Sequence, residues 1–305
     1  MYYLIGKTLE EHSKEEILQS ELPFAAALTQ EEWEEVKDSL GIVVYPEPDL
    51  SRIRATKAEE HLNSLTGTFS IPQKDNISGP HIRFFFALNE KGVVFVDETG
   101  TAETYLKDIS GRKQWNNPCL ERFLYDFLER MVIDDTDRLD KYEKKLDGIE
   151  KEIMKDKEAD YPKRISKIRN ELRELRIHYD QLEELGKELE ENGNQFFKEE
   201  NLRYFRMFSG RMNRLYDLAV SLRDYTVQLV DLYHSQTDLK MNRIMTALTV
   251  ITAIFMPLTL IVGWYGMNFV YMPELNSKYG YPLVILFSLS IVVGGLLYFR
   301  KKKWL

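Results

Sequence analysis

The sequence predicts a chain of mixed architecture: an α/β N-terminal cytosolic domain, a long helical coiled-coil section and a two-helix transmembrane hairpin. Three observations support this expectation. The first third alternates between segments typical of strands and of helices, and the middle repeats apolar residues in steps of three and four. Near the end, residues 244–262 and 281–299 carry no charged side chain, and each run is about long enough to cross a bilayer as a helix.

Residues 1–116 are expected to form the α/β domain. Thr29 followed by Glu32 has the pattern of a capping box, which should open a helix that Gly41 ends. The tetrapeptide at 89–92, Asn-Glu-Lys-Gly, predicts a hairpin turn between two strands. The segments expected to be strands are rich in β-branched and aromatic residues and cover 41–45, 65–71, 82–88 and 93–96.

Residues 117–195 are expected to form a helical hairpin. Asn117 and Pro118 supply the N-cap and first-turn proline of its first helix. A break near Asp160 separates two runs with coiled-coil spacing, so the two helices should pack antiparallel with charged residues outside. The acidic run 134–137 is then expected to be a solvated face rather than a metal site. The apolar positions are Leu139, Tyr142, Leu146, Ile149, Ile153, Ile165, Ile168, Leu172, Leu175, Leu182, Leu185 and Leu189.

The sequence at 191–194, Glu-Asn-Gly-Asn, should end this hairpin. From residue 196 to residue 262 no convincing helix terminator follows, since Pro257 falls inside the membrane run, where it kinks a helix without ending it. A single helix of that length would extend on the order of 100 Å. The expected segments are therefore a stalk helix over 196–243, a first transmembrane helix over 244–263, an extracytoplasmic loop over 264–280, a second transmembrane helix over 281–299 and a basic cytosolic tail over 300–305.

Basic residues predict the orientation of the hairpin. Lys240 and Arg243 precede the first span and residues 300–303 close the second, whereas the loop holds Lys278 against Glu274. This positive-inside pattern places both termini in the cytoplasm. The short chain then favours the plasma (inner) membrane of a bacterium or archaeon, as a multi-pass protein in the lipid bilayer.

Composition limits the classes of function. The 305-residue chain carries a formal net charge of -8, which argues against a nucleic-acid partner. The sequence contains no phosphate-binding glycine loop, nucleophile arrangement or closed metal-ligand cluster, so neither an enzyme nor a bound cofactor is expected. The lone Cys119 fits a reducing compartment, and the N-terminus does not have the pattern of a secretory signal. Because two spans cannot enclose a pore, any transport function requires a homo-oligomer.

A stripe of small and weakly polar residues follows one face of the first span, while the other face is Ile, Leu, Val, Ala and Phe. This contrast suits a helix turned toward the axis of a pore, but small residues and Thr also line ordinary helix interfaces in membranes. Both interpretations remain open on the stripe alone. The stripe comprises Asn242, Met245, Leu248 with Thr249, Thr252, Met256, Thr259 and Gly263.

Asn242 is the most telling member of the stripe. Mg²⁺ gives up its water reluctantly, so a ring of neutral amide oxygens can select the hydrated ion through its water shell. Asp231, three helical turns earlier on the same side, either concentrates cations at the inner opening or is a solvent-exposed acid on a stalk. Met245, Leu248 and Met256 are candidates for apolar constrictions that gate by dewetting.

The tripeptide Gly266-Met267-Asn268 directly follows the first span. A short polar turn between two spans places backbone and amide oxygens at the mouth of a membrane pore, where an ion channel selects its ion. A plain membrane anchor needs no such turn.

These residues resemble the CorA-type magnesium channels, most strongly from about Asn242 to the end of the chain. The segments that carry the resemblance are Met256-Pro-Leu-Thr259, Tyr265-Gly-Met-Asn-Phe269, Met272-Pro-Glu-Leu275, Gly280-Tyr-Pro282 and the terminal Lys-Lys-Lys-Trp-Leu305. The resemblance implies a funnel-shaped homopentamer that transports Mg²⁺, with the first span lining the pore and the second outside it. It also implies that Gly266, Met267 and Asn268 form the selectivity filter and that Asn268 and Asn242 contact hydrated Mg²⁺ through its water shell.

The resemblance assigns further residues. Met245, Leu248, Thr252, Met256 and Thr259 fall along the pore, Asp231 at the cytosolic mouth and Glu274 in the outer loop. Val270 stands where relatives carry an acid, and Met207 stands where relatives that sense intracellular Mg²⁺ carry a stalk acid. The acids that could form a substitute sensing site are Asp97, Glu98, Glu103, Asp217 and Asp224.

Two alternatives remain beside the magnesium channel. A related channel would move Zn²⁺, Co²⁺ or Ni²⁺; the stripe offers neither Cys nor His to a dehydrated Zn²⁺, and His234 lies alone on the stalk. A different class is a membrane-anchored coiled-coil scaffold or sensor. That class explains the long helices and the anchor, but it leaves the polar turn and the stripe without a role.

Overall fold

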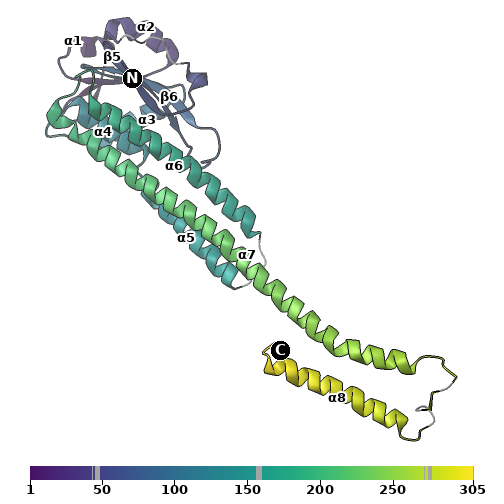
Figure 1. Cartoon of the computed structure of the whole chain (residues 1–305). Coiled ribbons are helices and arrows are strands. Elements are labelled where there is room, and N and C mark those ends of the chain that lie inside the picture. Colours follow the sequence, from purple (N-terminus) through teal and green to yellow (C-terminus); the bar gives the residue numbers. More distant parts are fainter. Residues whose placement is uncertain (43, 45–48, 156–159, 271, 274–276, 305) are drawn as a thin grey trace. The chain divides into compact units, whose positions relative to one another are not determined.

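The computed structural model describes residues 1–42, 44, 49–155, 160–270, 272–273 and 277–304. The chain divides into two compact units. Unit 1 comprises residues 1–152 and 158–230, and unit 2 comprises residues 153–157 and 231–305. The order of the elements along the chain can be followed in Figure 1.

Unit 1 contains a seven-stranded mixed sheet with the order β2-β1-β3-β7-β6-β5-β4 (Figure 1). Only β3 and β7 run parallel, and the other neighbours are antiparallel. The hairpin turn predicted at 89–92 is confirmed, because Asn89 pairs with Gly92 and its Oδ1 accepts a hydrogen bond of 2.9 Å from the Lys91 N–H. The strands are β1 (Tyr2–Ile5), β2 (Leu9–His12), β3 (Phe24–Leu28), β4 (Lys57–His61), β5 (Ser64–Ile71), β6 (Ile82–Asn89) and β7 (Gly92–Val96).

One face of the sheet packs against α1 (Lys14–Gln19) and α2 (Gln30–Leu40). Trp33 of α2 is fully buried and meets Phe85 of β6 edge to face, with ring centroids 5.9 Å apart. The predicted capping box opens α2: the Glu32 N–H donates to the Thr29 hydroxyl, and the Glu32 carboxylate accepts from the Thr29 N–H. The helix ends at Gly41, whose φ of 67° is the left-handed conformation that favours glycine.

The opposite face of the sheet packs against α3 (Thr101–Arg112) and α4 (Leu120–Met131). Side chains alternate across a strand, so Phe84 and Phe86 lie on the other side from Phe85. Phe127 of α4 stacks on Phe95 of β7 with ring centroids 3.9 Å apart. This second core therefore joins the sheet to the helical part of unit 1.

The helical part is a bundle rather than a two-helix coiled coil. In Figure 1, α5 (Asp135–Met154), α6 (Tyr161–Glu191) and the first part of α7 (Arg203–Tyr265) run side by side. Tyr142 of α5 donates a hydrogen bond of 2.8 Å to Glu171 of α6, and Tyr225 of α7 donates one of 2.8 Å to Glu150 of α5. All twelve apolar positions predicted for the hairpin are buried, but a third helix shares their core.

The acidic run at 134–137 is only partly the solvated face that the sequence indicated. Asp134 is exposed and pairs with Lys74, whereas Asp135 is 2% exposed. The Asp135 carboxylate accepts hydrogen bonds from the Tyr179 hydroxyl at 3.0 Å and from Arg138 at 2.7 Å, and burial raises its pKa. The prediction was wrong for Asp135, because Tyr179 reaches it from a distant part of the chain.

Two other local predictions were wrong. Among the described residues of 41–45, none is in a strand; Val43 and Tyr45 lie outside the described residues. The first helix of the bundle section starts at Leu120 with Cys119 at its N-cap, two residues after Pro118. The short 3-10 turns η1 (Leu50–Arg52) and η2 (Glu199–Asn201) were not foreseen, and η2 delays the start of the stalk helix.

Unit 2 contains the end of α7 and the whole of α8 (Gly280–Lys301). The prediction of one uninterrupted helix is confirmed from Arg203 to Tyr265, a run of 63 residues that keeps Pro257 inside it. Both α7 and α8 are long and apolar enough to cross a membrane. They approach closely at Gly295, where an added Cβ would lie 3.0 Å from Cγ1 of Ile254.

Candidate functional site

The tripeptide Gly266-Met267-Asn268 begins where α7 ends. The Gly266 N–H still donates to the carbonyl of Val262 at 2.9 Å, and the Met267 N–H donates weakly to Trp264 at 3.4 Å, so the helix unwinds across the motif. An added Cβ at Gly266 would lie 3.0 Å from the Val262 oxygen, which favours glycine there. Asn268 is exposed, and its amide has no hydrogen-bond partner in the part of the chain that the structure describes. That amide is therefore available to a ligand.

The packing of α8 divides α7 into two faces. Val250 and Ile254 are only 4% and 8% exposed, and Ile254 lies against Gly295 of α8. At about 100° per residue, every member of the predicted stripe lies about 120° to 180° around the helix from Ile254. The stripe therefore faces away from α8, and its members between Asn242 and Gly263 are exposed. An interface with α8 of the same chain does not explain it.

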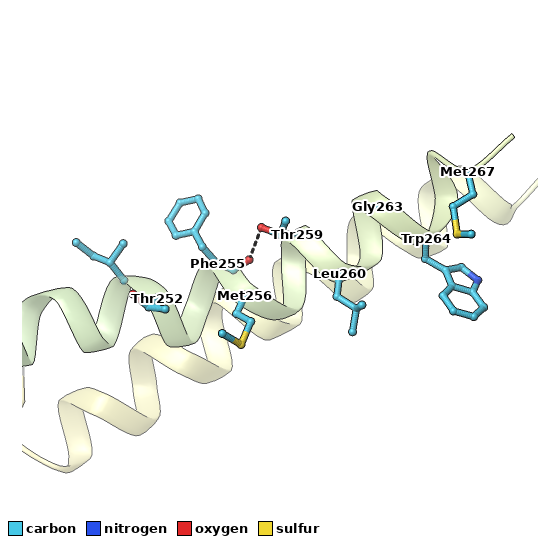
Figure 2. Close-up of a pocket in the computed structure, with 9 residues that line it drawn as sticks. Thr252, Phe255, Met256, Thr259, Leu260, Gly263, Trp264 and Met267 are labelled. Carbon is cyan, nitrogen blue, oxygen red and sulfur yellow. Dashed lines mark hydrogen bonds between the residues drawn. The ribbon is translucent and has the colours of Figure 1, made fainter.

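Threonine hydroxyls on the stripe bond back to the helix. Thr249, Thr252 and Thr259 each donate to the backbone carbonyl four residues earlier, at 2.7, 2.8 and 2.9 Å. Figure 2 draws the bond from Thr259 to the carbonyl of Phe255. Such bonds satisfy the hydroxyl hydrogen within an apolar environment.

A shallow groove joins the stripe to the motif (Figure 2). Four stripe members, Thr252, Met256, Thr259 and Gly263, line it together with Met267 of the tripeptide. The structure thus brings three of the six predicted pore-lining residues, Thr252, Met256 and Thr259, and Met267 of the predicted filter onto one surface. Sequence reasoning missed further residues that line the same groove. Ile251, Phe255 and Leu260 were grouped with the apolar face, and Trp264 was placed in the loop.

Asn242 and Asp231 extend the stripe toward the start of α7. They are separated by eleven residues, which is about three turns and leaves them roughly 20° apart around the helix. Both side chains are exposed, and neither forms a hydrogen bond within the described ranges of the chain. Glu274, predicted in the outer loop, lies outside the described residues, and Val270 is fully exposed.

Acids suggested as a substitute sensing site have other partners. The buried Asp97 carboxylate accepts from the N–H groups of Thr99 and Ala102 and so caps the start of α3. Glu98 accepts from the Gln30 N–H at 2.7 Å, at the start of α2. Glu103 pairs with Lys107. These three side chains therefore stabilise helix ends and turns.

The remaining acids named for sensing, Asp217 and Asp224, are exposed on α7, as is Met207. Across residues 1–42, 44, 49–155, 160–270, 272–273 and 277–304, one chain contains no group of three or more His, Cys, Asp or Glu side chains placed to hold a metal ion. The candidate oxygen donors of the site are instead neutral, from amides, hydroxyls and backbone carbonyls. Such donors suit a hydrated cation held through its water shell.

An α/β domain, a helical bundle and two membrane-length helices, the first of which ends in an exposed polar turn, define a membrane protein of the two-span type. The sequence model described as "CorA-like Mg2+ transporter protein" matches residues 27–303. The chain therefore belongs to the CorA family, which is membrane-embedded.

Individual relatives agree with this assignment. The "Cobalt/magnesium transport protein CorA" of Thermotoga maritima is 37% identical over 182 residues, which cover 60% of this chain and 52% of that protein. The "Magnesium transport protein CorA" of Haemophilus influenzae is 43% identical over 68 residues, or 22% of each chain. The chain thus spans about half the length of the Thermotoga relative and less of the other.

A solved structure supports the fold over the whole chain. The CorA magnesium transporter of Methanocaldococcus jannaschii has a TM-score of 0.74 and covers 100% of this chain and 98% of its own, at 18% identity. The α/β N-terminal domain, the long helix and the C-terminal helix pair are therefore the family's fold.

Proposed function

We propose that several copies of this chain form a passive channel for Mg²⁺, with the first membrane helix of each copy around a central axis. The observation that carries this proposal is the position of the stripe: it lies opposite the face that packs on α8 and reaches the Gly266-Met267-Asn268 turn. The stripe carries neutral oxygens and small side chains and is left uncovered within a membrane-length helix. Such a surface favours water or protein as its neighbour over lipid, and a ring of copies around a water-filled pore supplies both water and protein.

The assembly in this proposal is a homopentamer, as the resemblance to CorA channels implies. Its copies lie in the plasma membrane with both termini in the cytoplasm, supported by Lys240 and Arg243 before the first span and the basic residues 300–303 after the second. The membrane potential, negative inside, then drives Mg²⁺ inward.

Selection in this proposal does not require dehydration. Gly266, Met267 and Asn268 form the outer ring, where backbone and amide oxygens accept hydrogen bonds from the water shell of Mg²⁺. Asn242 repeats the same contact at the inner end, and Asp231 attracts cations to the cytosolic mouth. Weak, repeated binding lets the ion leave as readily as it enters.

The middle of the pore contains the gate in this proposal. Met245, Leu248 and Met256 are exposed apolar side chains on the stripe. A ring of such side chains closes a narrow pore by excluding water, without a steric plug.

A second candidate ion is Co²⁺, because the Thermotoga relative is named a cobalt/magnesium transport protein. A site that contacts only the water shell distinguishes divalent ions of similar hydrated size poorly, so Co²⁺ is expected to share the pathway. Competition between Co²⁺ and Mg²⁺ for flux tests this point.

The test of the proposal is Mg²⁺ uptake into liposomes that contain the full chain. We expect Asn268→Ala to reduce Mg²⁺ uptake at least tenfold, while Asn213→Ala, an exposed position on the cytosolic part of the same helix, leaves it unchanged. Cross-linking should give a pentamer for both variants. Parent protein that is monomeric, or liposomes that remain impermeable to Mg²⁺ at every voltage, would refute the channel.

A further inference from the structure

A second, deeper groove lies between α7 and α8 at the end that carries the tripeptide. It encloses about 1090 Å³ and is open on one side. Both helices contribute to its walls, and no charged residue is among the described residues that line it. Its main walls are Leu260, Ile261 and Trp264 from α7 and Tyr281, Val284 and Phe287 from α8.

The groove exists because the two helices pack unevenly. Near the other end of α8, Gly295 allows close contact with Ile254. Toward the tripeptide the facing positions are large, and the side chains of Trp264, Tyr281 and Phe287 remain 63%, 78% and 57% exposed. The space between the helices is therefore not filled by their own side chains.

The lining changes in polarity along the groove. At the end near the tripeptide the lining residues include Trp264, Tyr265, Tyr281 and Ser277, each of which carries a polar group. One to two helical turns further along α8, Val284 and Phe287 make the lining purely apolar. Trp and Tyr favour the boundary between headgroups and hydrocarbon. This polarity gradient matches an amphiphile with its polar part at the mouth.

The side on which the groove lies indicates what fills it. Ile261 and Tyr265 lie about 20° around α7 from Ile254, on the side opposite the stripe. Leu260 and Trp264, about 120° and 80° from Ile254, line both grooves and separate them. If the stripe faces the pore axis, the groove faces the periphery of the assembly. A neighbouring copy packs around the axis, so the bilayer is the nearer source of an occupant.

We propose that an acyl chain of a membrane phospholipid occupies this groove, with the ester oxygens of the lipid at the mouth formed by Trp264, Tyr265 and Tyr281. An empty groove would forfeit the dispersion contacts of its walls, and the surrounding hydrocarbon can restore them. Gly266 also lines the groove, so the lipid packs behind the selectivity turn and helps to fix its position. This inference rests on the proposed channel, because the channel sets which side faces lipid.

The experiment uses the full chain purified in mild detergent, with palmitoyl-oleoyl phosphatidylglycerol as the probe. Native mass spectrometry counts the lipids that stay bound after loosely held lipids are removed by collision. We expect one resistant lipid per protomer in the parent. Val284→Trp, which fills the groove, should reduce its retention roughly tenfold. Leu286→Trp is the matched control, because Leu286 is on the same helix but does not line the groove.

Equal lipid retention in the two variants, or no resistant lipid in the parent, would overturn the inference. A Phe287→Cys variant in a Cys119→Ser background tests whether a second copy of the chain covers the groove instead. Efficient disulfide-linked dimers through the introduced thiols of two protomers would show that it does. Mg²⁺ uptake by the same preparations separates the two proposals. Uptake by a parent that retains no lipid refutes the lipid site alone, whereas absence of uptake refutes the channel.

Discussion

Acidification should destabilise unit 1 through His178. This side chain lies on α6, is 3% exposed, and its Nδ1 has no hydrogen-bond partner in the part of the chain that the structure describes. It borders a cavity of about 30 Å³, enough for one water molecule, between the sheet and the helices. Burial lowers the pKa of His178 to about 3, and the nearby charges of His81 and Arg138 contribute to the lowering.

The charged surroundings of His178 come from several elements. The cavity is lined by Lys74, Asp135 and Arg138, and Asp135 already pairs with Arg138. His81, before β6, lies 4.0 Å from Glu174, which is one helical turn before His178. Protonated His178 would therefore add an uncompensated buried charge.

The sign of the effect follows from the two states of the chain. His178 stays neutral in the folded state, whereas in the unfolded chain it binds a proton below its ordinary pKa of 6.5. The contribution of neutral His178 to the free energy of unfolding is therefore fully present above pH 6.5, and it is lost as the pH decreases from 6.5 toward 3. At about 1.4 kcal/mol for each unit of pH, the free energy of unfolding should decrease by about 2 kcal/mol between pH 7.5 and pH 5.

Urea unfolding of the detergent-solubilised chain measures this change. Trp33 and Trp115 are buried in unit 1, so their fluorescence reports on its unfolding, in a background where Trp264 and Trp304 are replaced by Phe. We expect His178→Gln to abolish most of the decrease between pH 7.5 and pH 5.

The control for this prediction is an exposed histidine. His234→Gln, on the exposed surface of α7, should keep the pH dependence of the parent. If His178→Gln shows the same decrease as the parent, the reasoning about this buried imidazole is wrong.

Three further substitutions test the packing. Phe127→Ala removes the ring between the sheet and α4 and should cost about 3–5 kcal/mol of unfolding free energy in urea. Tyr179→Phe leaves the buried Asp135 without one donor and should cost about 1–3 kcal/mol in the same assay. Gly295→Leu forces a side chain against Ile254 and should cost about 1–3 kcal/mol, seen as a lower melting temperature in detergent. Gly294→Leu is its control, because an added Cβ at Gly294 would meet nothing within 4 Å, and equal melting of the two glycine variants would contradict the contact.

Periodicity in the sequence predicted the buried residues of those elements in which the buried side chains share one face. The spacing of apolar residues along α5 and α6 gave the correct buried positions, because burial there depends on the residue's place in its own helix. The strand β3, with its Ala25, Ala26 and Ala27, was missed. Alanine is uncommon in strands, and β3 is stabilised by its neighbours β1 and β7, which no local pattern reveals.

The stripe on α7 was predictable for the same reason, because a helix fixes which residues share a face. What faces the stripe was not predictable from it. The contact between Ile254 and Gly295 shows that α8 of the same chain packs on the opposite face of α7, and the signal for it in the sequence was the pair of glycines at 294–295 within an apolar run. Burial of Asp135 was hidden for a similar reason, since its partner Tyr179 lies 44 residues away.

The threonine hydroxyls of α7 favour a positively charged ion over a negatively charged one. Thr249, Thr252 and Thr259 each direct their one hydrogen into the helix backbone, so their oxygens present only lone pairs outward. Water molecules around a cation point both hydrogens outward, whereas those around an anion turn one hydrogen inward and expose their oxygen and one hydrogen. In the proposed ring, such oxygens would accept hydrogen bonds from the hydration shell of a cation and offer chloride no donor. The pore would then distinguish cations from anions without any charged side chain inside the span.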